Sequence, residues 1–421
     1  MLFSYFDVGF SSAKAVERSF AKHVRTLSGY RTKVAKVVAQ HDNKHPEYAL
    51  VHAKAVTVHD TIDAVRKQFD GIKHLVLVGI GGSNLGTEAV HELLGEKKVQ
   101  LHTLATVAPY QIEQVLASLK RVKQVKQIAV CVISKSGGTT ETLVNTAVLL
   151  NALEARFGKS IYKQTIYVGN PATSTMKTMK RAGATAVAMP EVVGGRFSVG
   201  TEVGLVPLAL LGHNVDAFIA GLLDASKEEF ESVTAQNAAR LYVYLQKKYT
   251  HYNFVAFEPR LYKLGAWYRQ LQAESLGKTH TKKNKKNTKG FVSAINTAVE
   301  LHSTGQLYMS GLLPTYTDFV TFDDMDCNFD IPKTGIAKAF AKLNLQDIAT
   351  GIYGGVVQAY QAKRLPYRST IFDDDLDYSV GLFMGMRMME TMYVAHLLDV
   401  DVFDQPNVEL YKQKTREILD L

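Results

Sequence analysis

The stretch Leu75-Val-Leu-Val-Gly-Ile-Gly-Gly-Ser-Asn-Leu-Gly86 is the part of the chain that decides the fold. It predicts a buried strand, then a glycine-rich turn, and then a helix through residues 89–94. In a parallel sheet such a turn lies at the carboxyl end of its strand, where ligands bind. Glycines admit an anion to the backbone, and the N-terminus of a helix favours negative charge. We therefore expect Gly82 and Ser83 to contact an anion; a purely steric role for the glycines is the alternative.

A second turn, Ser134-Lys-Ser-Gly-Gly-Thr-Thr140, follows an apolar run at 128–133 and precedes a helical period at 143–153. Its hydroxyls, glycines and lysine are the short-range donors that a phosphate monoester requires. We expect Ser134, Ser136 and Thr139 to bind the phosphate, with Lys135 in the same loop. Helix capping is the alternative, but one hydroxyl would satisfy a cap. Neither turn matches a dinucleotide or Walker motif, which favours a phosphorylated sugar over a nucleotide.

Strands alternate with helices along most of the chain, which predicts an α/β fold with two doubly wound parallel-sheet domains, flanking helices and a C-terminal helix. We expect an N-terminal helical segment at 1–60, a first domain at 61–200, a second at 201–400 and the C-terminal helix at 401–421. The supporting segments are strands at 165–168, 184–189, 253–257, 291–294 and 319–322, and helices at 203–248, 264–274, 381–398 and 408–421.

The composition is that of a soluble globular protein, with 421 residues, 46% of them hydrophobic and 21% charged. No apolar run approaches the roughly 20 residues that span a bilayer, and the N-terminus does not have the pattern of a secretory signal. Cys131 lies within an apolar run and Cys327 is distant from it in sequence. We therefore expect no structural disulfide and a cytoplasmic location.

The formal net charge is +9, with the densest cluster of lysines at 281–289. We interpret this cluster as a solvated loop. Nucleic-acid binding is the alternative, but no nucleic-acid-binding motif accompanies the lysines. A contribution to attracting a phosphorylated substrate stays open.

A candidate base follows from the helix at 264–274. Its apolar residues Leu264, Trp267, Tyr268 and Leu271 recur at the spacing of one buried face. Glu274 extends that face, and a carboxylate there is costly unless it is paired or functional. The alternative is an acid at the end of the helix that points to solvent, since Gly277 is a suitable helix terminator.

Six motifs together resemble the glucose-6-phosphate isomerase family, with its sugar isomerase (SIS) domains, in the family's order over residues 79–412. They are Gly79-Ile-Gly-Gly-Ser-Asn-Leu-Gly86, Ser134-Lys-Ser-Gly-Gly-Thr-Thr-Glu141, Gly194-Gly-Arg-Phe-Ser198, Glu274-Ser-Leu-Gly-Lys278, Leu301-His-Ser303 and Asp404-Gln-Pro-Asn-Val-Glu-Leu-Tyr-Lys412. The resemblance implies reversible interconversion of glucose 6-phosphate and fructose 6-phosphate through ring opening and a cis-enediol.

The resemblance also implies roles for individual residues. Glu274 would be the base that moves a proton between C2 and C1, and Arg196 would stabilise the enediolate. His302 would assist ring opening in the active site of a neighbouring subunit, which implies a homodimer. Gln270 and Gln405 would contact the sugar.

Lys412 would share in ring opening, with Lys414 as the fallback. Spacing alone predicts that Lys412 flanks a packed stripe of Val408, Tyr411, Thr415 and Ile418, as a surface lysine would. Asn407 stands where the family usually has glycine, which leaves the backbone near Gln405 less defined.

We expect neither a metal nor an organic cofactor, because no His/Asp/Glu cluster has ligand spacing. Two other functions stay open. One is a bifunctional phosphoglucose/phosphomannose isomerase, and the other is a non-catalytic phosphosugar-binding SIS module, for which the phosphate loops alone would suffice.

Overall fold

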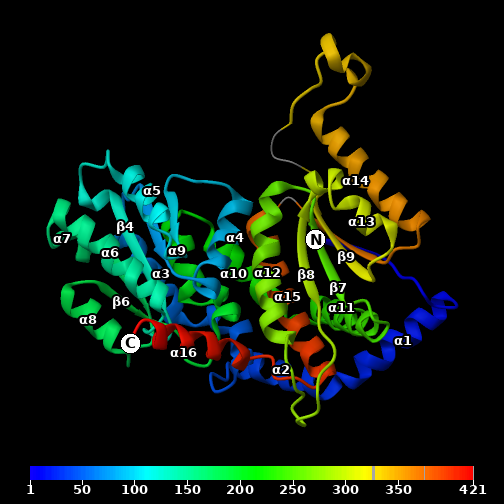
Figure 1. Cartoon of the computed structure of the whole chain (residues 1–421), viewed down its shortest axis with the longest axis horizontal. Coiled ribbons are helices and arrows are strands. Elements are labelled where there is room, and N and C mark those ends of the chain that lie inside the picture. Colours follow the sequence, from blue (N-terminus) through cyan, green and yellow to red (C-terminus); the bar gives the residue numbers. More distant parts are fainter. Residues whose placement is uncertain (325–327, 374, 421) are drawn as a thin grey trace.

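The first of two five-stranded sheets is wholly parallel, with the order β3-β2-β4-β5-β6 (Figure 1). The computed structural model describes residues 1–324, 328–373 and 375–420, so Cys327 lies outside the described residues. The strands are β2 His74–Val78, β3 Gln100–Leu104, β4 Ile128–Ser134, β5 Thr165–Gly169 and β6 Thr185–Ala188. Because β3 and β4 lie on opposite sides of β2, the strand order reverses between β2 and β4. This switch point is where ligands bind in doubly wound sheets.

The second sheet has the order β1-β10-β9-β7-β8. Its strands are β1 Leu2–Phe6, β7 His251–Ala256, β8 Val292–Thr297, β9 Thr315–Phe322 and β10 Tyr367–Phe372. Strands β7 to β10 are parallel, and β1 joins the edge of β10 antiparallel to it. Without β1, the order β8-β7-β9-β10 repeats the order β3-β2-β4-β5 of the first sheet. The predicted class, α/β with two parallel sheets, is confirmed.

Helices cover both faces of the first sheet. Apolar side chains of α3 (Val56–Gln68) and α9 (Glu202–Leu210) pack against one face. On the other face lie α5 (Pro109–Leu119), α6 (Thr140–Phe157), α7 (Ser160–Lys163) and α8 (Ser174–Ala182). With helices on both sides, a central strand such as β4 is buried at every residue, which explains its uninterrupted apolar sequence.

The second sheet is covered in the same way. Helices α10 (Val215–Asp224), α11 (Glu228–Gln246), α12 (Tyr262–Leu276) and α15 (Leu376–Leu398) contribute to the large core on one face. Helices α13 (Gly305–Ser310) and α14 (Leu345–Ala362) pack on the other. Helices α4 (Leu85–Leu94) and α12 lie between the two sheets (Figure 1). The C-terminal α16 (Glu409–Ile418) crosses below the first sheet in this view and has no buried residue.

The N-terminal segment differs from its prediction in two respects. Residues Leu2–Phe6 form a strand that pairs with β10, and their aromatic side chains are themselves typical of strands. Helices α1 (Ala13–Thr26) and α2 (Ser28–Gln40) follow as predicted. The segment was also expected to lie at the periphery, but Leu27 and Val34 belong to the main core. Strands β3 and β10 were also absent from the prediction. The lysine-rich stretch is an exposed loop, as predicted.

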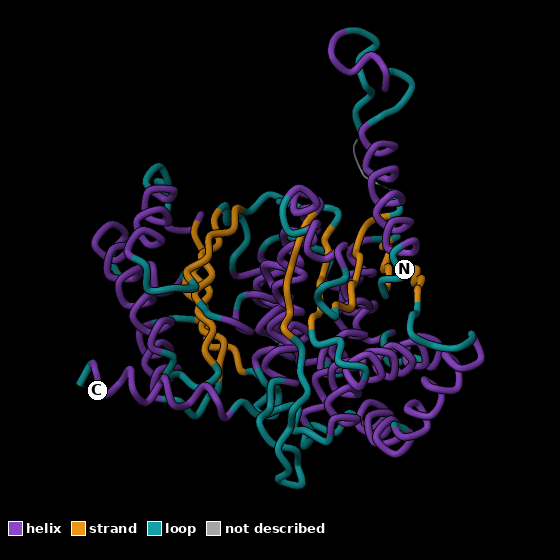
Figure 2. Tube along the Cα trace, turned by 45° about the vertical axis from the view of Figure 1, so that its right-hand side comes forward, coloured by secondary structure: helices purple, strands orange, loops and turns teal. Residues whose placement is uncertain are grey.

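A helical arm formed by α14 and the residues before it projects far from the second sheet (Figure 2). Ile336 and Phe340, in the 3₁₀ turn Gly335–Phe340 that precedes α14, are exposed. In the described part of the chain, no helix is long and apolar enough to cross a membrane.

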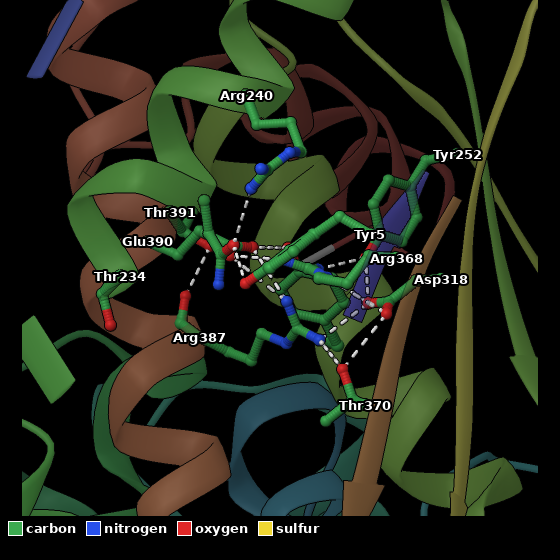
Figure 3. A network of polar contacts seen from close by, with 12 residues as sticks. Tyr5, Thr234, Arg240, Tyr252, Asp318, Arg368, Thr370, Arg387, Glu390 and Thr391 are labelled. Carbon is green, nitrogen blue, oxygen red and sulfur yellow. Dashed lines mark hydrogen bonds and ion pairs between the residues drawn. The ribbon is translucent and has the colours of Figure 1, made fainter. Parts of the chain in front are cut away.

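Four buried charges join the second sheet to α15 (Figure 3). Arg368 on β10 pairs with Asp318 on β9 at 2.7 Å and with Glu390 on α15 at 2.6 Å. Arg387 contacts the same two carboxylates at 2.7 and 3.2 Å. All four side chains are at most 2% exposed, so two cations balance two anions inside the core. The hydroxyl of Tyr268 on α12 donates to Glu390 at 2.7 Å, which connects the network to α12.

Replacing Arg387 with methionine tests the importance of this charge balance. The change leaves two buried carboxylates with a single cation, and breaking a buried pair costs about 3–5 kcal/mol. We expect Arg387→Met to lower the free energy of unfolding, measured with urea, by about that amount. Arg121→Met, at an exposed position, is the control and should change it little. A loss below about 1 kcal/mol in Arg387→Met would show that the network contributes little.

Candidate active site

The first glycine-rich loop links β2 to α4 and rests on the backbone of a distant segment. Gly81 has a φ of +62°, a conformation that favours glycine. A Cβ on Gly82 would lie 2.1 Å from the carbonyl carbon of Gly195, so only glycine permits this approach. Ser83 is half-buried beside these glycines. The predicted anion-binding turn therefore adjoins the segment that carries Arg196.

The second loop links β4 to α6, and its hydroxyls also shape its backbone. Ser134 Oγ accepts a hydrogen bond from the N–H of Gly137 at 3.2 Å, and Ser136 Oγ accepts one from the N–H of Gly138 at 3.2 Å. Thr139 stands at the N-cap of α6, yet its side chain makes no capping hydrogen bond. The capping alternative therefore does not explain Thr139, whose hydroxyl lies at the start of an 18-residue helix.

Lys135 of the second loop turns toward the segment that the first loop touches. Its Nζ donates to the carbonyl of Val193 at 3.0 Å, and burial lowers the pKa of the lysine. Since β2 and β4 are parallel neighbours, both loops lie at the same edge of the sheet, at its switch point. The predicted phosphate-binding residues are thus brought together, and the segment from Val193 to Arg196 touches both loops.

Arg196 lies at the start of the 3₁₀ turn Gly195–Gly200 and is 3% exposed. Its Nε donates to Ser275 Oγ at 2.8 Å, and its Nη1 donates to Glu274 Oε2 at 3.2 Å. Nη1 also donates to Gln405 Oε1 at 2.8 Å, while Nη2 donates to the carbonyls of Val402 and Asp404 at 2.6 and 3.0 Å. All five N–H donors of the guanidinium are therefore engaged. Burial lowers its pKa, and the charge of Glu274 opposes that shift.

Glu274 lies in the last turn of α12. The predicted stripe of Leu264, Trp267, Tyr268 and Leu271 is buried as expected, but Ser275 continues it. Glu274 stands at the edge of the stripe, with its side chain 35% exposed and paired with Arg196. Gln270, one turn earlier, donates to Glu274 Oε1 at 2.9 Å. Both oxygens of the carboxylate are thus oriented by a partner, although Glu274 lies at the end of the helix and is partly exposed.

Of the predicted C-terminal site residues, one contacts Arg196 and the other pairs within its own helix. Gln405 reaches Arg196, whereas Lys412 pairs with Glu409 at 2.7 Å on α16. The predicted packing of α16 is wrong, because Tyr411 and Ile418 are 55% and 80% exposed. Lys412 is instead half-buried, on the same side as Val408 and Thr415. With few packing contacts to orient it, α16 turns its other face to solvent. The fallback, Lys414, pairs with Glu417 and is 60% exposed.

His302 lies far from Glu274 within this chain. It ends the 3₁₀ turn Ala298–His302 after the carboxyl end of β8, and it is exposed. Helix α12 begins near the carboxyl end of the adjacent parallel strand β7 and runs back along the sheet. Glu274 is therefore at the opposite end of α12, roughly 20 Å away at 1.5 Å per residue.

The sequence prediction omitted three members of this cluster. Ser275 binds Arg196, and Lys278 pairs with the carboxylate of Asp404 at 2.9 Å. Ser275 and Lys278 belong to the motif that contains Glu274, so the motif itself was the available signal. Among the described residues, no three His, Cys, Asp or Glu side chains are grouped so as to hold a metal ion.

Comparisons with known proteins agree on one family. The model of the phosphoglucose isomerase family matches residues 14–322. A glucose-6-phosphate isomerase of Thermus thermophilus is 32% identical over 378 residues, covering 86% of this chain and 88% of that protein. The protein of the same name from Leuconostoc mesenteroides is 29% identical over 375 residues, covering 83% and 80%.

Solved structures show the same fold. A hypothetical protein from Thermus thermophilus has a TM-score of 0.83 and 25% identity, covering 99% of this chain and all of that one. A glucose-6-phosphate isomerase from Chlamydia trachomatis has a TM-score of 0.81 and 16% identity, covering 99% and 88%. On the match of the family model and the identity to the Thermus enzyme, the chain belongs to the phosphoglucose isomerase family, and it is an isomerase.

Proposed function

We propose that this enzyme interconverts glucose 6-phosphate and fructose 6-phosphate in the cytoplasm, as a step of sugar-phosphate metabolism. The observation that carries the proposal is the cluster of Arg196, Glu274, Gln270 and Gln405, joined by one short segment to both anion-binding loops. A phosphate held at the loops would leave the sugar carbons to extend toward Glu274.

The loops act as the grip for the phosphate. Hydroxyls of Ser83, Ser134, Ser136 and Thr139 supply neutral donors, as do the free N–H groups at the helix N-termini. Lys135 adds a positive charge whose position is set by its bond to Val193. This combination suits a phosphate monoester, and it leaves the carbon skeleton to be recognised by other groups.

Glu274 acts as the base in the proton transfer. From the open-chain aldose its carboxylate takes the proton on C2, while the C1 carbonyl oxygen gains a proton, which gives the cis-enediol. Glu274 then returns its proton to C1 as the C2 hydroxyl loses one, which gives the ketose. Gln270 and Arg196 hold the two carboxylate oxygens, so the base is oriented before the substrate arrives.

Arg196 stabilises the negative charge that develops on the enediolate oxygens. Its Nε and Nη2 are bound to Ser275 and to backbone carbonyls that fix the plane of the guanidinium. Its Nη1 holds only the side chains of Glu274 and Gln405. An enediolate oxygen would therefore bind at Nη1 by replacing one of these two contacts.

Ring opening requires groups at the ring oxygen and the anomeric hydroxyl. We assign this step to Lys412 and to His302 from a second copy of the chain, so that a homodimer would contain two shared sites. The exposure of His302 and its distance from Glu274 of the same chain support this assignment.

The two alternatives differ in what they require. A phosphosugar-binding module needs the loops but has no use for an arginine and a glutamate held in contact beyond them. A bifunctional phosphoglucose/phosphomannose isomerase would use the same groups, because its reaction also passes through an enediol. Assays with both substrates therefore separate the three functions.

Glu274→Gln tests the base assignment. The variant keeps the shape of the side chain and removes its basicity, and a general base contributes about 10²–10⁴-fold to the rate. In a coupled assay, we expect wild type to turn over fructose 6-phosphate and Glu274→Gln to lose kcat by that factor. Mannose 6-phosphate is assayed in parallel. Glu17→Gln, at an exposed position of α1, is the control. Full activity in Glu274→Gln would refute the assignment, and wild type that binds without turnover would favour the binding module.

Mixing two inactive variants tests the shared site. If His302 serves the partner's Glu274, a heterodimer of Glu274→Gln and His302→Ala contains one intact site and one doubly altered site. Random exchange of equal amounts makes half of the dimers mixed, so about a quarter of all sites become intact. We expect co-refolding to restore about that fraction of wild-type activity. Mixtures no more active than the separate variants would assign His302 to its own chain or to no site.

A further inference from the structure

Residues 402–407, here called the strap, link the core to α16 and pass over the last turn of α12. Val402 is buried, and Phe403 packs on Phe197 with ring centroids 5.3 Å apart. From residue 404 onward the strap is exposed, apart from the half-buried Val408 that follows it. Its position beyond Phe403 therefore depends on polar contacts.

Lys278 makes two of these polar contacts with the strap and a third with α12. Its Nζ donates to the carbonyl of Glu274 at 2.8 Å, and it also contacts both the carbonyl and the carboxylate of Asp404, the latter at 2.9 Å. The side chain is 6% exposed, although it carries a charge. A buried lysine needs compensation of this kind, since burying an ion is costly unless it is paired and hydrogen-bonded. Lys278 thus joins the residue that bears the base to the strap.

The sequence around Lys278 explains how the side chain reaches back. Gly277 ends α12, and a Cβ on it would lie 2.6 Å from the carbonyl of Ala273. Because glycine has no Cβ, this clash is absent and the chain can turn sharply at Gly277. The amine of Lys278 then lies over the last turn of α12. There it meets the free carbonyl of Glu274, at the negative end of the helix dipole. Asn407 donates to the carbonyl of Gly277 at 3.3 Å and adds a contact from the strap.

We infer that Lys278 is a positioning residue for catalysis: it holds the strap against α12 so that Glu274, Arg196 and Gln405 keep their mutual geometry. This inference rests on the proposed function. Lys278 acts through two neighbours, because it fixes the backbone of Glu274 directly and fixes Gln405 through Asp404, the preceding residue.

Charge supports the same conclusion. Arg196 is influenced by the charges of both Glu274 and Asp404, and it already donates to the carbonyl of Asp404. Lys278 pairs with the carboxylate of Asp404 and so offsets one of the three carboxylates, those of Glu274, Asp401 and Asp404, whose charges act on Arg196. Without Lys278, Asp404 would compete with Glu274 for Arg196. The guanidinium of Arg196 would then move toward Asp404 and away from the place where the enediolate is proposed to bind.

The inference is tested with Lys278→Met, which keeps the length and apolar character of the side chain and removes its charge. Misplacement by about 1 Å costs on the order of 100-fold in rate. We expect kcat for fructose 6-phosphate to fall by about 10-fold to 100-fold. The inhibition constant of inorganic phosphate should stay within about twofold of wild type, because Lys278 makes no contact with the loops. Lys283→Met, an exposed lysine of the adjacent loop, is the matched control and should keep wild-type kcat.

Asp404→Asn provides a second variant at an exposed position. It removes the ion pair but leaves Lys278 its two carbonyl contacts, so we expect a smaller fall in kcat with unchanged phosphate inhibition. In the double variant the loss should not exceed that of Lys278→Met, since both changes act on one contact. If Lys278→Met does not fold, Asp404→Asn decides alone, and wild-type kcat in that variant would refute the inference.

Three further results would also overturn it: wild-type kcat in Lys278→Met, parallel loss of phosphate inhibition, or fully additive losses in the double variant. Failure of the proposed function would look different. In that case wild type itself would show no turnover, whatever the variants do.

Discussion

The arrangement of the site depends on the Arg196 guanidinium, which is buried and binds five separate groups. Each N–H donor of a buried guanidinium needs an acceptor, and the five N–H groups point in fixed directions. Each acceptor is therefore held in one place. Those partners come from the last turn of α12 and from residues 402–405, which are far apart in sequence. The hydrogen bonds that compensate the buried charge of Arg196 therefore also bring together the groups that the proposed reaction needs.

Two close contacts also fix the position of Arg196 relative to the two glycine-rich loops. Gly82 touches Gly195, the residue before Arg196, and Lys135 binds Val193 two residues earlier. These contacts leave no room for a side chain at Gly82, so the first loop and Arg196 have a defined separation. An open-chain sugar phosphate can place its reacting carbons at many distances from its phosphate, so the site has to select one of them. A site that fixes the distance between grip and base is therefore suited to it.

Local patterns in the sequence predicted the parts of this structure that depend on local physics. The apolar runs of β2 and β4, their glycine-rich turns and the buried face of α12 were all evident from spacing. Strand β1 was included in a helical segment although its aromatic residues favour a strand, and its partner, β10, was absent from the prediction. For α16, spacing placed Tyr411 and Ile418 inward, but they are exposed. A helix with little packing has no core to select its face, so its pattern gives no guide to its orientation.

The two sheets share a strand order but differ in the loops that follow their central strands. In the first sheet, the strands at the switch point end in Gly, Ser and Thr loops. The equivalent strands of the second sheet, β7 and β9, are followed by Phe257-Glu258 and by Asp323, not by loops of this composition, and Glu258 pairs with Arg260 at 3.3 Å. The second sheet has another role. Its buried charges hold α15, and Tyr268 attaches α12 to them, so the helix that carries Glu274 has a rigid support. The two glycine-rich loops thus lie on the first sheet and the helix that carries Glu274 is supported by the second, an arrangement that suits the proposed roles of phosphate grip and base.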